Sequence, residues 1–585
     1  MITLSTFQEY LSSRESLSSA ESVSLSETQA LPSSSNRSAS GQEHYLLKLL
    51  ATLPSQTPAQ QTEQLEKVLT VLREFNIDEL QRLKLTATII DASDPLIATL
   101  RQHYIYETGV LSDVQLAYVA QVKSLYYLII MVYDRVIHHN QSLLHSQRKH
   151  PTGKVWQRYF KTSRASSITL ATAIYQTLLM YQKLLGEDAI GYQKPSSYLW
   201  LKINQLYSLA HKCQVVTIDL SVSRVTKAIH RAHTIHQLYC QICLYSLLNV
   251  RAMQRSNILL VQRLLPEWAE YIVATIEPKT ETRVFVDLDS DKPPTYLTAN
   301  SDINPYEDHC HCLFIELTPM VDHLKSRMQA LIKEGGEGIE YHLLNKISMT
   351  IDYRYLQPQP ILVTKYPVKK DAVLITGFNK IHYRVSGSQS FRILIAMKDL
   401  PKEHRPSYDT DGQKQDGRDL FVCETLGNNN DGSLFRTLQL TTKAGSPLAI
   451  NEFAPTAPPP LSTMNLFLIC RSDTSTQSDW SMGMARWLNL DAKEPEVEWQ
   501  VLGHTLVACG LLLEGRETRN RHFVPAFILG RDEQLQTTGT LIVPTAYFQT
   551  NDRVIMRINT KQTPLRLGAR LLSTDEFSQY EVVKL

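Results

Sequence analysis

The spacing of apolar residues changes near residue 277, and this change constrains the fold more than any other feature. Before it, apolar residues recur at three- and four-residue steps, as within Gln60–Phe75, which is the spacing of one helix face. After it, short runs alternate in the manner of strands, as in Thr282–Leu288 and Phe391–Met397. We therefore expect a multidomain α+β protein, with an all-α helical N-terminal region followed by a β-barrel-rich C-terminal half.

The length of 585 residues exceeds what one hydrophobic core can hold. The pattern predicts five segments: a disordered Ser-rich tail (1–42), an all-α domain (43–276), an α+β linker module (277–368), a β-barrel domain (369–515) and a C-terminal β module (516–585). The tail has no apolar periodicity, so it buries too little surface to offset its ordering entropy.

The all-α domain is expected to contain seven to nine helices packed as a bundle or short array. Within it, Leu80–Tyr106 is predicted as two helices interrupted at Asp94-Pro95, because proline lacks the N–H that continues a helix. No fixed repeat period is visible, which leaves a tetratricopeptide-type solenoid as the second choice.

Two strand-like runs, Trp480–Leu488 and Val497–Leu513, flank a turn at Asp491–Pro495. This order predicts a hairpin, and further short strands on both sides predict a small barrel. The sequence leaves open whether the C-terminal strands form one barrel or two.

Composition narrows the class of protein. The net charge is +2, and no long Lys/Arg block marks a nucleic-acid partner. The longest apolar run, Leu125–Tyr133, is far shorter than the roughly 20 residues that a membrane span needs. No secretory signal is visible, and the eight cysteines lack a framework spacing, which favours reduced thiols and a cytoplasmic location.

One helix stripe carries residue types that bind metals: His233, His236, Cys240 and Cys243. Apolar residues surround this stripe, and one helix rarely closes a tetrahedral site, so we favour a packed His/Cys stripe over a metal or redox centre. The run His309–Cys312 would split its ligands between two strand faces. No nucleotide loop, nucleophile elbow or zinc-protease motif is present. We predict no enzymatic activity, no metal and no cofactor.

Five segments in a fixed order carry a family resemblance: Tyr192–Ala210, Leu264–Tyr271, Val284–Thr298, Ile375–Tyr383 and Met482–Leu513. The chain resembles large gammaproteobacterial proteins that end in a PilZ-like domain, the bacterial receptor barrel for cyclic di-GMP. The resemblance implies that 369–515 is a PilZ-like barrel. It also implies a cytoplasmic role in cyclic di-GMP signalling.

PilZ receptors bind the dinucleotide through an RxxxR stretch before the barrel and a [D/N]xSxxG turn on its first strands. Here the turn position reads Leu440-Thr-Thr-Lys-Ala-Gly445. Thr442 stands for the serine and Gly445 for the glycine, but Leu440 replaces the acidic or amide residue. Upstream of this turn lie Arg405, Arg418 and Arg436, and no two of them have the RxxxR spacing. Arg436 and Arg486 are the remaining candidates for a phosphate contact, with surface arginines as the alternative.

These observations predict a non-enzymatic regulatory or scaffolding protein, whose degenerate PilZ-like domain serves protein contact and whose helical region offers the partner surface. One alternative is a functional cyclic di-GMP effector with an unusual site. Another is a helical adaptor or chaperone-like protein whose β domains are structural. An enzyme would require a metal on the His233–Cys243 stripe.

Overall fold

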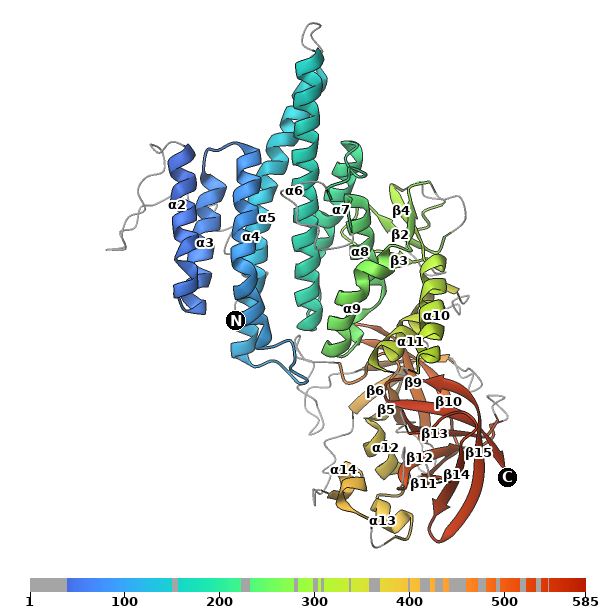
Figure 1. Ribbon diagram of the computed structural model, residues 1–585. Helices are drawn as coiled ribbons and strands as arrows, with labels where there is room; N and C mark the ends of the chain where they lie inside the picture. Colours follow the sequence, from blue (N-terminus) through green and yellow to red (C-terminus); the bar gives the residue numbers. More distant parts are fainter. Residues whose placement is uncertain are drawn as a thin grey trace.

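The computed structural model places a block of upright helices beside a small α+β module, with two β-barrels packed against one end (Figure 1). The structure describes residues 39–149, 156–221, 232–277, 282–297, 303–306, 310–335, 338–356, 369–397, 400–410, 421–426, 435–440, 459–471, 480–490, 495–515, 522–532, 538–545 and 547–584. The all-α region and the β-barrels agree with the predicted fold class.

Eight α-helices precede residue 270 in the described part of the chain: α2 (Ala39–Ala51), α3 (Pro58–Glu74), α4 (Glu79–Gln102), α5 (Asp113–Lys149), α6 (Trp156–Ile190), α7 (Ser197–Lys212), α8 (Ile235–Leu247) and α9 (Arg255–Ala269). Because α2 begins at Ala39, the last residues of the predicted disordered tail are helical, and the rest of that tail lies outside the described residues. The predicted break at Pro95 is wrong, since α4 continues through it. The carbonyl that Pro95 cannot donate to belongs to Asp91, which is exposed, so water can reach that carbonyl.

The linker module is a four-stranded antiparallel sheet in the order β1-β4-β2-β3, followed by two helices. Its elements are β1 (Val273–Thr275), β2 (Val284–Asp287), β3 (Thr295–Tyr296), β4 (Cys312–Glu316), α10 (Thr318–Lys333) and α11 (Ile339–Ile351). A π-helical turn, η4 (Asp352–Leu356), continues α11. Strand β1 precedes the predicted boundary at 277, so one edge strand of the sheet is formed by residues that were assigned to the helical region.

Two closed six-stranded barrels follow. The first contains β5 (Lys369–Thr376), β6 (Phe421–Leu426), β7 (Phe435–Leu440), β8 (Leu466–Arg471), β9 (Trp480–Asn489) and β10 (Glu496–Gly503). The second contains β11 (Leu506–Leu513), β12 (Val524–Leu529), β13 (Thr540–Pro544), β14 (Arg553–Ile558), β15 (Lys561–Ser573) and β16 (Phe577–Lys584).

The predicted hairpin is present, because β9 and β10 pair antiparallel. The predicted single strand Val497–Leu513 is wrong: the chain bends at His504 and Thr505, and β11 pairs in the second barrel with β12 and β14. The boundary between the barrels therefore falls before β11, earlier than the predicted division at 515.

Three short helices lie beside the second barrel: α12 (Phe378–Val385), α13 (Phe391–Leu394) and α14 (Ser407–Thr410). The first of them, α12, also contacts β5 and β8 of the first barrel. The predicted strand at Phe391–Met397 is wrong, because α13 begins at Phe391. Ser390 caps α13 by accepting from the N–H of Ile393, and Phe391 packs into a cluster with Ala508 of β11. Local capping and this tertiary contact outweigh the alternating pattern.

One apolar cluster belongs to both barrels. It contains Leu468 and Met484 from the first barrel and Phe527 and Phe577 from the second. The barrels therefore share a buried interface.

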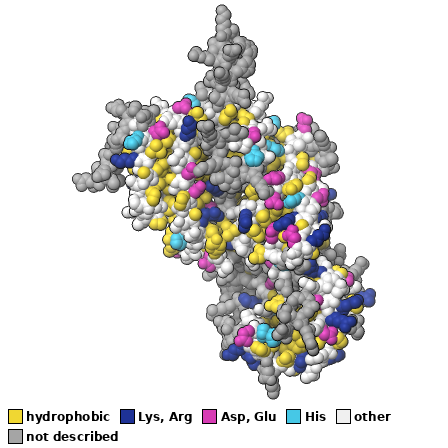
Figure 2. Space-filling view, viewed as in Figure 1, with side chains coloured by type: hydrophobic (Ala, Val, Ile, Leu, Met, Phe, Trp, Pro, Cys, Tyr) yellow, Lys and Arg dark blue, Asp and Glu magenta, His cyan; other side chains and the backbone are white. Residues whose placement is uncertain are grey.

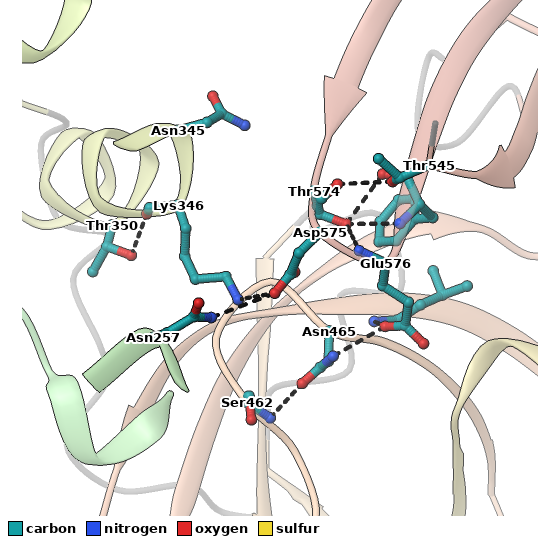
Figure 3. Close-up of polar contacts among 12 residues, drawn as sticks. Asn257, Asn345, Lys346, Thr350, Ser462, Asn465, Thr545, Thr574, Asp575 and Glu576 are labelled. Carbon is teal, nitrogen blue, oxygen red and sulfur yellow. Dashed lines mark hydrogen bonds and ion pairs between the residues drawn. The ribbon is translucent and has the colours of Figure 1, made fainter. Parts of the chain in front are cut away.

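The β15–β16 turn joins four parts of the molecule (Figure 3). Asp575 accepts from Lys346 Nζ of α11 at 2.9 Å and lies 3.5 Å from Asn257 Nδ2 of α9. Burial alone would raise the pKa of Asp575, but Lys346 lowers it below its ordinary value. The neighbouring Glu576 accepts from Asn465 Nδ2 at 3.0 Å. It also accepts from the backbone N–H groups of Leu466 and Phe378, which Figure 3 does not label. We call Asp575 and Glu576 the turn carboxylates.

Candidate functional site

The outer face of the first barrel carries an irregularity at Arg486. In the β9–β10 ladder Trp487 pairs with Glu498 and Ala485 pairs with Trp499, so Arg486 has no partner residue and forms a β-bulge. Ala485 and Trp499 belong to the barrel core. The bulge therefore places two consecutive side chains, those of Arg486 and Trp487, on the outer side of the barrel wall.

The π-helical turn η4 lies against this face. Tyr353 donates a hydrogen bond to Glu498 Oε2 at 2.7 Å, and Arg354 Nη2 donates to Glu498 Oε1 at 2.6 Å. The side chains of Arg354 and Glu498 are only 10% and 12% exposed. Each carboxylate oxygen has its own donor, as a desolvated carboxylate requires. Burial, followed by the nearby Glu498 carboxylate, raises the pKa of Tyr353, which keeps this donor neutral.

Aromatic rings complete the site. The guanidinium of Arg354 lies 4.3 Å from the centre of the Trp487 ring, a cation–π contact. Trp487 in turn meets Tyr296 of β3 edge-on at 6.1 Å, and the Tyr296 hydroxyl donates to the carbonyl of Leu247 in α8. The site therefore lies where the helical region, the linker module and the first barrel meet.

Arg486 lies at the side of this site and has an unused hydrogen-bond donor, Nε. Its guanidinium is 5.8 Å from the Tyr353 ring, Nη1 contacts the sulfur of Met464 at 3.7 Å, and Nε has no hydrogen-bond partner in the described part of the chain. Burial lowers the pKa of Arg486, and the nearby Tyr353 and Asp352 oppose that shift. A guanidinium with an unused buried donor is suited to an anionic acceptor.

We name Tyr353, Arg354, Arg486, Trp487 and Glu498 the arginine–aromatic cluster. It contains two guanidinium groups, an indole face and a phenol within one joint. Guanidinium groups pair with phosphate oxygens and stack on planar rings, and indole faces stack on bases. The cluster therefore has the chemistry to bind a nucleotide phosphate and a base. In this structure Glu498 accepts from the Tyr353 hydroxyl and from Arg354 Nη2, two donors that such a phosphate would use.

The structure separates the two arginines predicted from sequence. Arg436 of β7 pairs with Trp499 across the ladder, and its guanidinium lies 5.9 Å from the Trp499 ring on the inner side of the wall. Arg486 lies on the outer side. Thr442 and Gly445 lie outside the described residues.

Sequence reasoning missed Tyr353, Arg354, Trp487 and Glu498. No sequence signal marks Arg354, which belongs to no RxxxR pair and is separated from β5 by a segment outside the described residues. The positions of Trp487 and Glu498 depend on the β-bulge, which the apolar periodicity of the sequence does not predict.

The His/Cys stripe is part of the helical core. His236 Nδ1 is 2.8 Å from the Tyr207 hydroxyl, and its Nε2 is 3.8 Å from Cys240 Sγ. His233 precedes α8, and burial raises the pKa of Cys240 to about 12. Across the residues with described coordinates, no group of three or more His, Cys, Asp or Glu side chains is arranged to hold a metal ion. His309 is outside this set.

One described segment, Asp113–Ser142 of α5, is long and apolar enough to cross a membrane. Of its most apolar window, 56% is buried inside the protein, as in the core helix of a bundle. On the face drawn in Figure 2, basic and acidic side chains are interspersed over the helical part.

Comparison with known proteins finds similarity at both ends of the chain. Residues 44–279 match the family model for the N-terminal domain of the cyclic-di-GMP receptor FimW, and residues 509–585 match the model for the FimW C-terminal β-barrel domain. The cyclic-di-GMP receptor FimW of Pseudomonas aeruginosa is 22% identical over 433 residues, which cover 66% of this chain and 67% of that protein. No solved structure matches the chain. The helical region and the second barrel are thus similar to the two terminal domains of the cyclic-di-GMP receptor FimW.

Proposed function

We propose that this protein is a non-enzymatic regulatory protein that binds cyclic di-GMP. The observation that carries the proposal is the paired similarity to FimW: both terminal domains occur in one chain, in the same order. A cytoplasmic, bacterial setting and a PilZ-like role for the first barrel are parts of the same proposal, motivated by the sequence resemblance.

The arginine–aromatic cluster is the site that we assign to the ligand. Cyclic di-GMP carries two phosphates and two guanine bases. Arg486 offers an unused donor, Arg354 a guanidinium already stacked on Trp487, and Trp487 a ring on which a base can stack. A phosphate that pairs with Arg354 displaces Glu498. Binding would then release η4 from β10 and change how the linker module sits on the barrel.

Isothermal titration of the full chain with cyclic di-GMP at physiological salt tests whether the protein binds the dinucleotide and whether the arginine–aromatic cluster is the site. The wild type is expected to bind with one saturable site. Arg486→Met and Arg354→Met are each expected to weaken binding at least about tenfold, because a charge-assisted hydrogen bond is lost. Arg436→Met is the matched control, since that arginine lies inside the wall, and its affinity should equal that of the wild type.

Two failures can be told apart. Wild-type binding that all three variants retain would reject the site but keep the receptor. An absence of binding heat and of any thermal shift at saturating ligand would reject the receptor itself. Thermal unfolding of each variant without ligand checks that it is folded.

A second function, protein binding by the helical region, is favoured by one surface. Tyr106, Val110 and Val114 are 77%, 50% and 63% exposed around the α4–α5 connection. Exposed apolar side chains grouped in one segment favour protein contact. Chemical crosslinking in cells should capture a partner with the wild type and lose it with Tyr106→Glu and Val114→Glu. Equal capture by the wild type and both variants would reject this surface.

A further inference from the structure

A cavity of about 330 Å³ lies inside the helical region, remote in sequence from the arginine–aromatic cluster. Helices α4, α5, α6, α8 and α9 contribute its wall. Its volume is at the lower end of the range for small-molecule pockets, about 300–1,000 Å³. Asp94 and Ala98 of α4 are exposed at its edge, so the cavity communicates with solvent there.

Lys183 of α6 lines the cavity, and its ammonium has no hydrogen-bond acceptor among the described residues. Its ammonium lies 5.3 Å from the centre of the Tyr126 ring, and no hydrogen bond or ion pair to it is formed by the residues whose positions the structure defines. Burial lowers the pKa of Lys183, while Asp94 opposes that shift. A half-buried ammonium against an aromatic face is stabilised by an anion.

Of the other charged side chains that line the cavity, Asp94 lies at the exposed edge, whereas Glu187 and Arg101 pair with each other. Glu187 is 2% exposed, accepts from the Tyr104 hydroxyl at 2.7 Å and forms an ion pair with Arg101 Nε at 2.9 Å. The remaining polar groups include the amides of Gln182, Gln241 and Gln262. Gln262 donates to the Tyr245 hydroxyl at 3.0 Å, whereas the Gln182–Gln241 contact is long, at 3.4 Å, so this amide pair can exchange its weak bond for one to a ligand.

The rest of the wall is apolar, with Ile97, Leu179 and Leu265 among its lining residues. We propose that this cavity binds a small amphipathic organic anion, with one acidic group on Lys183, an apolar body against these side chains, and a hydrogen bond to the Gln182–Gln241 pair. A cyclic dinucleotide carries two phosphates and two purines, whereas the cavity offers one unpaired cation. The site is therefore separate from the one assigned to cyclic di-GMP.

Anilinonaphthalene sulfonate is a suitable probe, because it combines one anionic group with an aromatic body and fluoresces in apolar surroundings. Titration into the folded full chain should show one saturable site. Lys183→Met keeps the apolar stem over Tyr126 and removes the charge, so the affinity should fall at least about tenfold. Lys67→Met is the matched control, since Lys67 is 61% exposed on α3. Its affinity should equal that of the wild type.

Competition defines the chemistry of the ligand. Octanoate should displace the probe at least about tenfold more effectively than octanol, which has the same apolar chain without charge. Octylamine should not displace it. Ala98→Trp should block the cavity from its edge and abolish saturable binding without removing any charge.

Equal affinity in the wild type and Lys183→Met, or equal competition by octanoate and octanol, would overturn the anion site. Displacement of the probe by cyclic di-GMP at one equivalent, dependent on Lys183, would also overturn it, because the cavity would then be the dinucleotide site. Neither result bears on Arg486, so the two proposals fail separately. Thermal unfolding of each variant confirms the fold, and Lys183→Met should unfold no earlier than the wild type because it removes a buried charge.

Discussion

The two barrels have the same strand number, yet they differ in what fills them and in what covers them. The first is filled around Trp499, whose ring is so close to β9 that a Cβ at Gly483 would lie 2.5 Å from it, and η4 lies on its outer face. The second is filled by Tyr580 and smaller residues and is covered by α13, while α12 contacts strands of both barrels.

The FimW models match the second barrel and the helical region but do not cover residues 280–508. The arginine–aromatic cluster lies in that uncovered part. The similarity to FimW therefore covers the helical region and the second barrel, whereas the proposed ligand site rests on the geometry of the first barrel.

The largest expected effect is in the core of the first barrel. Trp499→Ala removes its largest buried side chain and should lower the free energy of unfolding by about 3–5 kcal/mol. Tyr580→Phe in the second barrel loses only the hydroxyl that donates to the Phe548 carbonyl and should cost about 1 kcal/mol. Denaturant unfolding followed by circular dichroism measures both. Because the barrels share a core cluster, both should unfold in one transition. Two separated transitions in Trp499→Ala would show that they are independent.

The next effect concerns the joint between the barrels. Glu576→Ala leaves three donors without an acceptor, from Phe378, Asn465 and Leu466, and should cost about 2–3 kcal/mol. Glu576→Gln keeps one acceptor oxygen and should cost less in the same unfolding experiment. Equal losses in the two variants would mean that the carboxylate does not join the barrels.

A pH effect should come from the cover of the second barrel. His382 of α12 is fully buried between the Tyr408 hydroxyl and the Cys509 carbonyl, and burial lowers its pKa to about 4. The unfolded chain binds this proton near pH 6.5, so stability falls as the pH falls below that value. About 2 kcal/mol should be lost between pH 7 and pH 5. His382→Gln should remove this loss, and an unchanged pH profile in that variant would contradict the assignment.

The smallest effect compares the two members of one ion pair. Lys346 is 2% exposed and Asp575 is 31% exposed. Asp575→Asn leaves a buried ammonium without its partner, whereas Lys346→Met leaves a carboxylate that water reaches. The first should be the less stable variant by about 1–2 kcal/mol, after allowing for solvent screening of Asp575. Differential scanning calorimetry measures the order. The reverse order would mean that Lys346 is solvated in the folded protein.

The sequence predicted the helical region and most strands of the barrels because their apolar spacing repeats over many residues. It did not predict the continuous helix through Pro95 or the helix at Phe391, where solvation of one carbonyl and contact with Ala508 decide the outcome. It also predicted β10 and β11 as one strand, because the interruption of the apolar run at Gly503–Thr505 is too short to mark where the chain passes from one barrel to the next.

Of the two predicted site residues that the structure describes, Arg486 lies in the cluster and Arg436 does not. Arg436 has the same side chain, but the two-residue period of its strand places it on the opposite side of the wall. The bulge at Arg486 and the position of η4 are products of tertiary packing. Arg354 is far from Arg486 in the sequence, and no sequence pattern indicates that the two side chains lie close together.

Hydrogen–deuterium exchange of the full chain, with and without saturating cyclic di-GMP, tests the central claim most directly. Ligand binding at the arginine–aromatic cluster should alter exchange in Asp352–Leu356 and in β9 and leave β12 and β13 of the second barrel unchanged. Changes confined to the second barrel, or none anywhere, would contradict the claim that the first barrel and η4 hold the ligand.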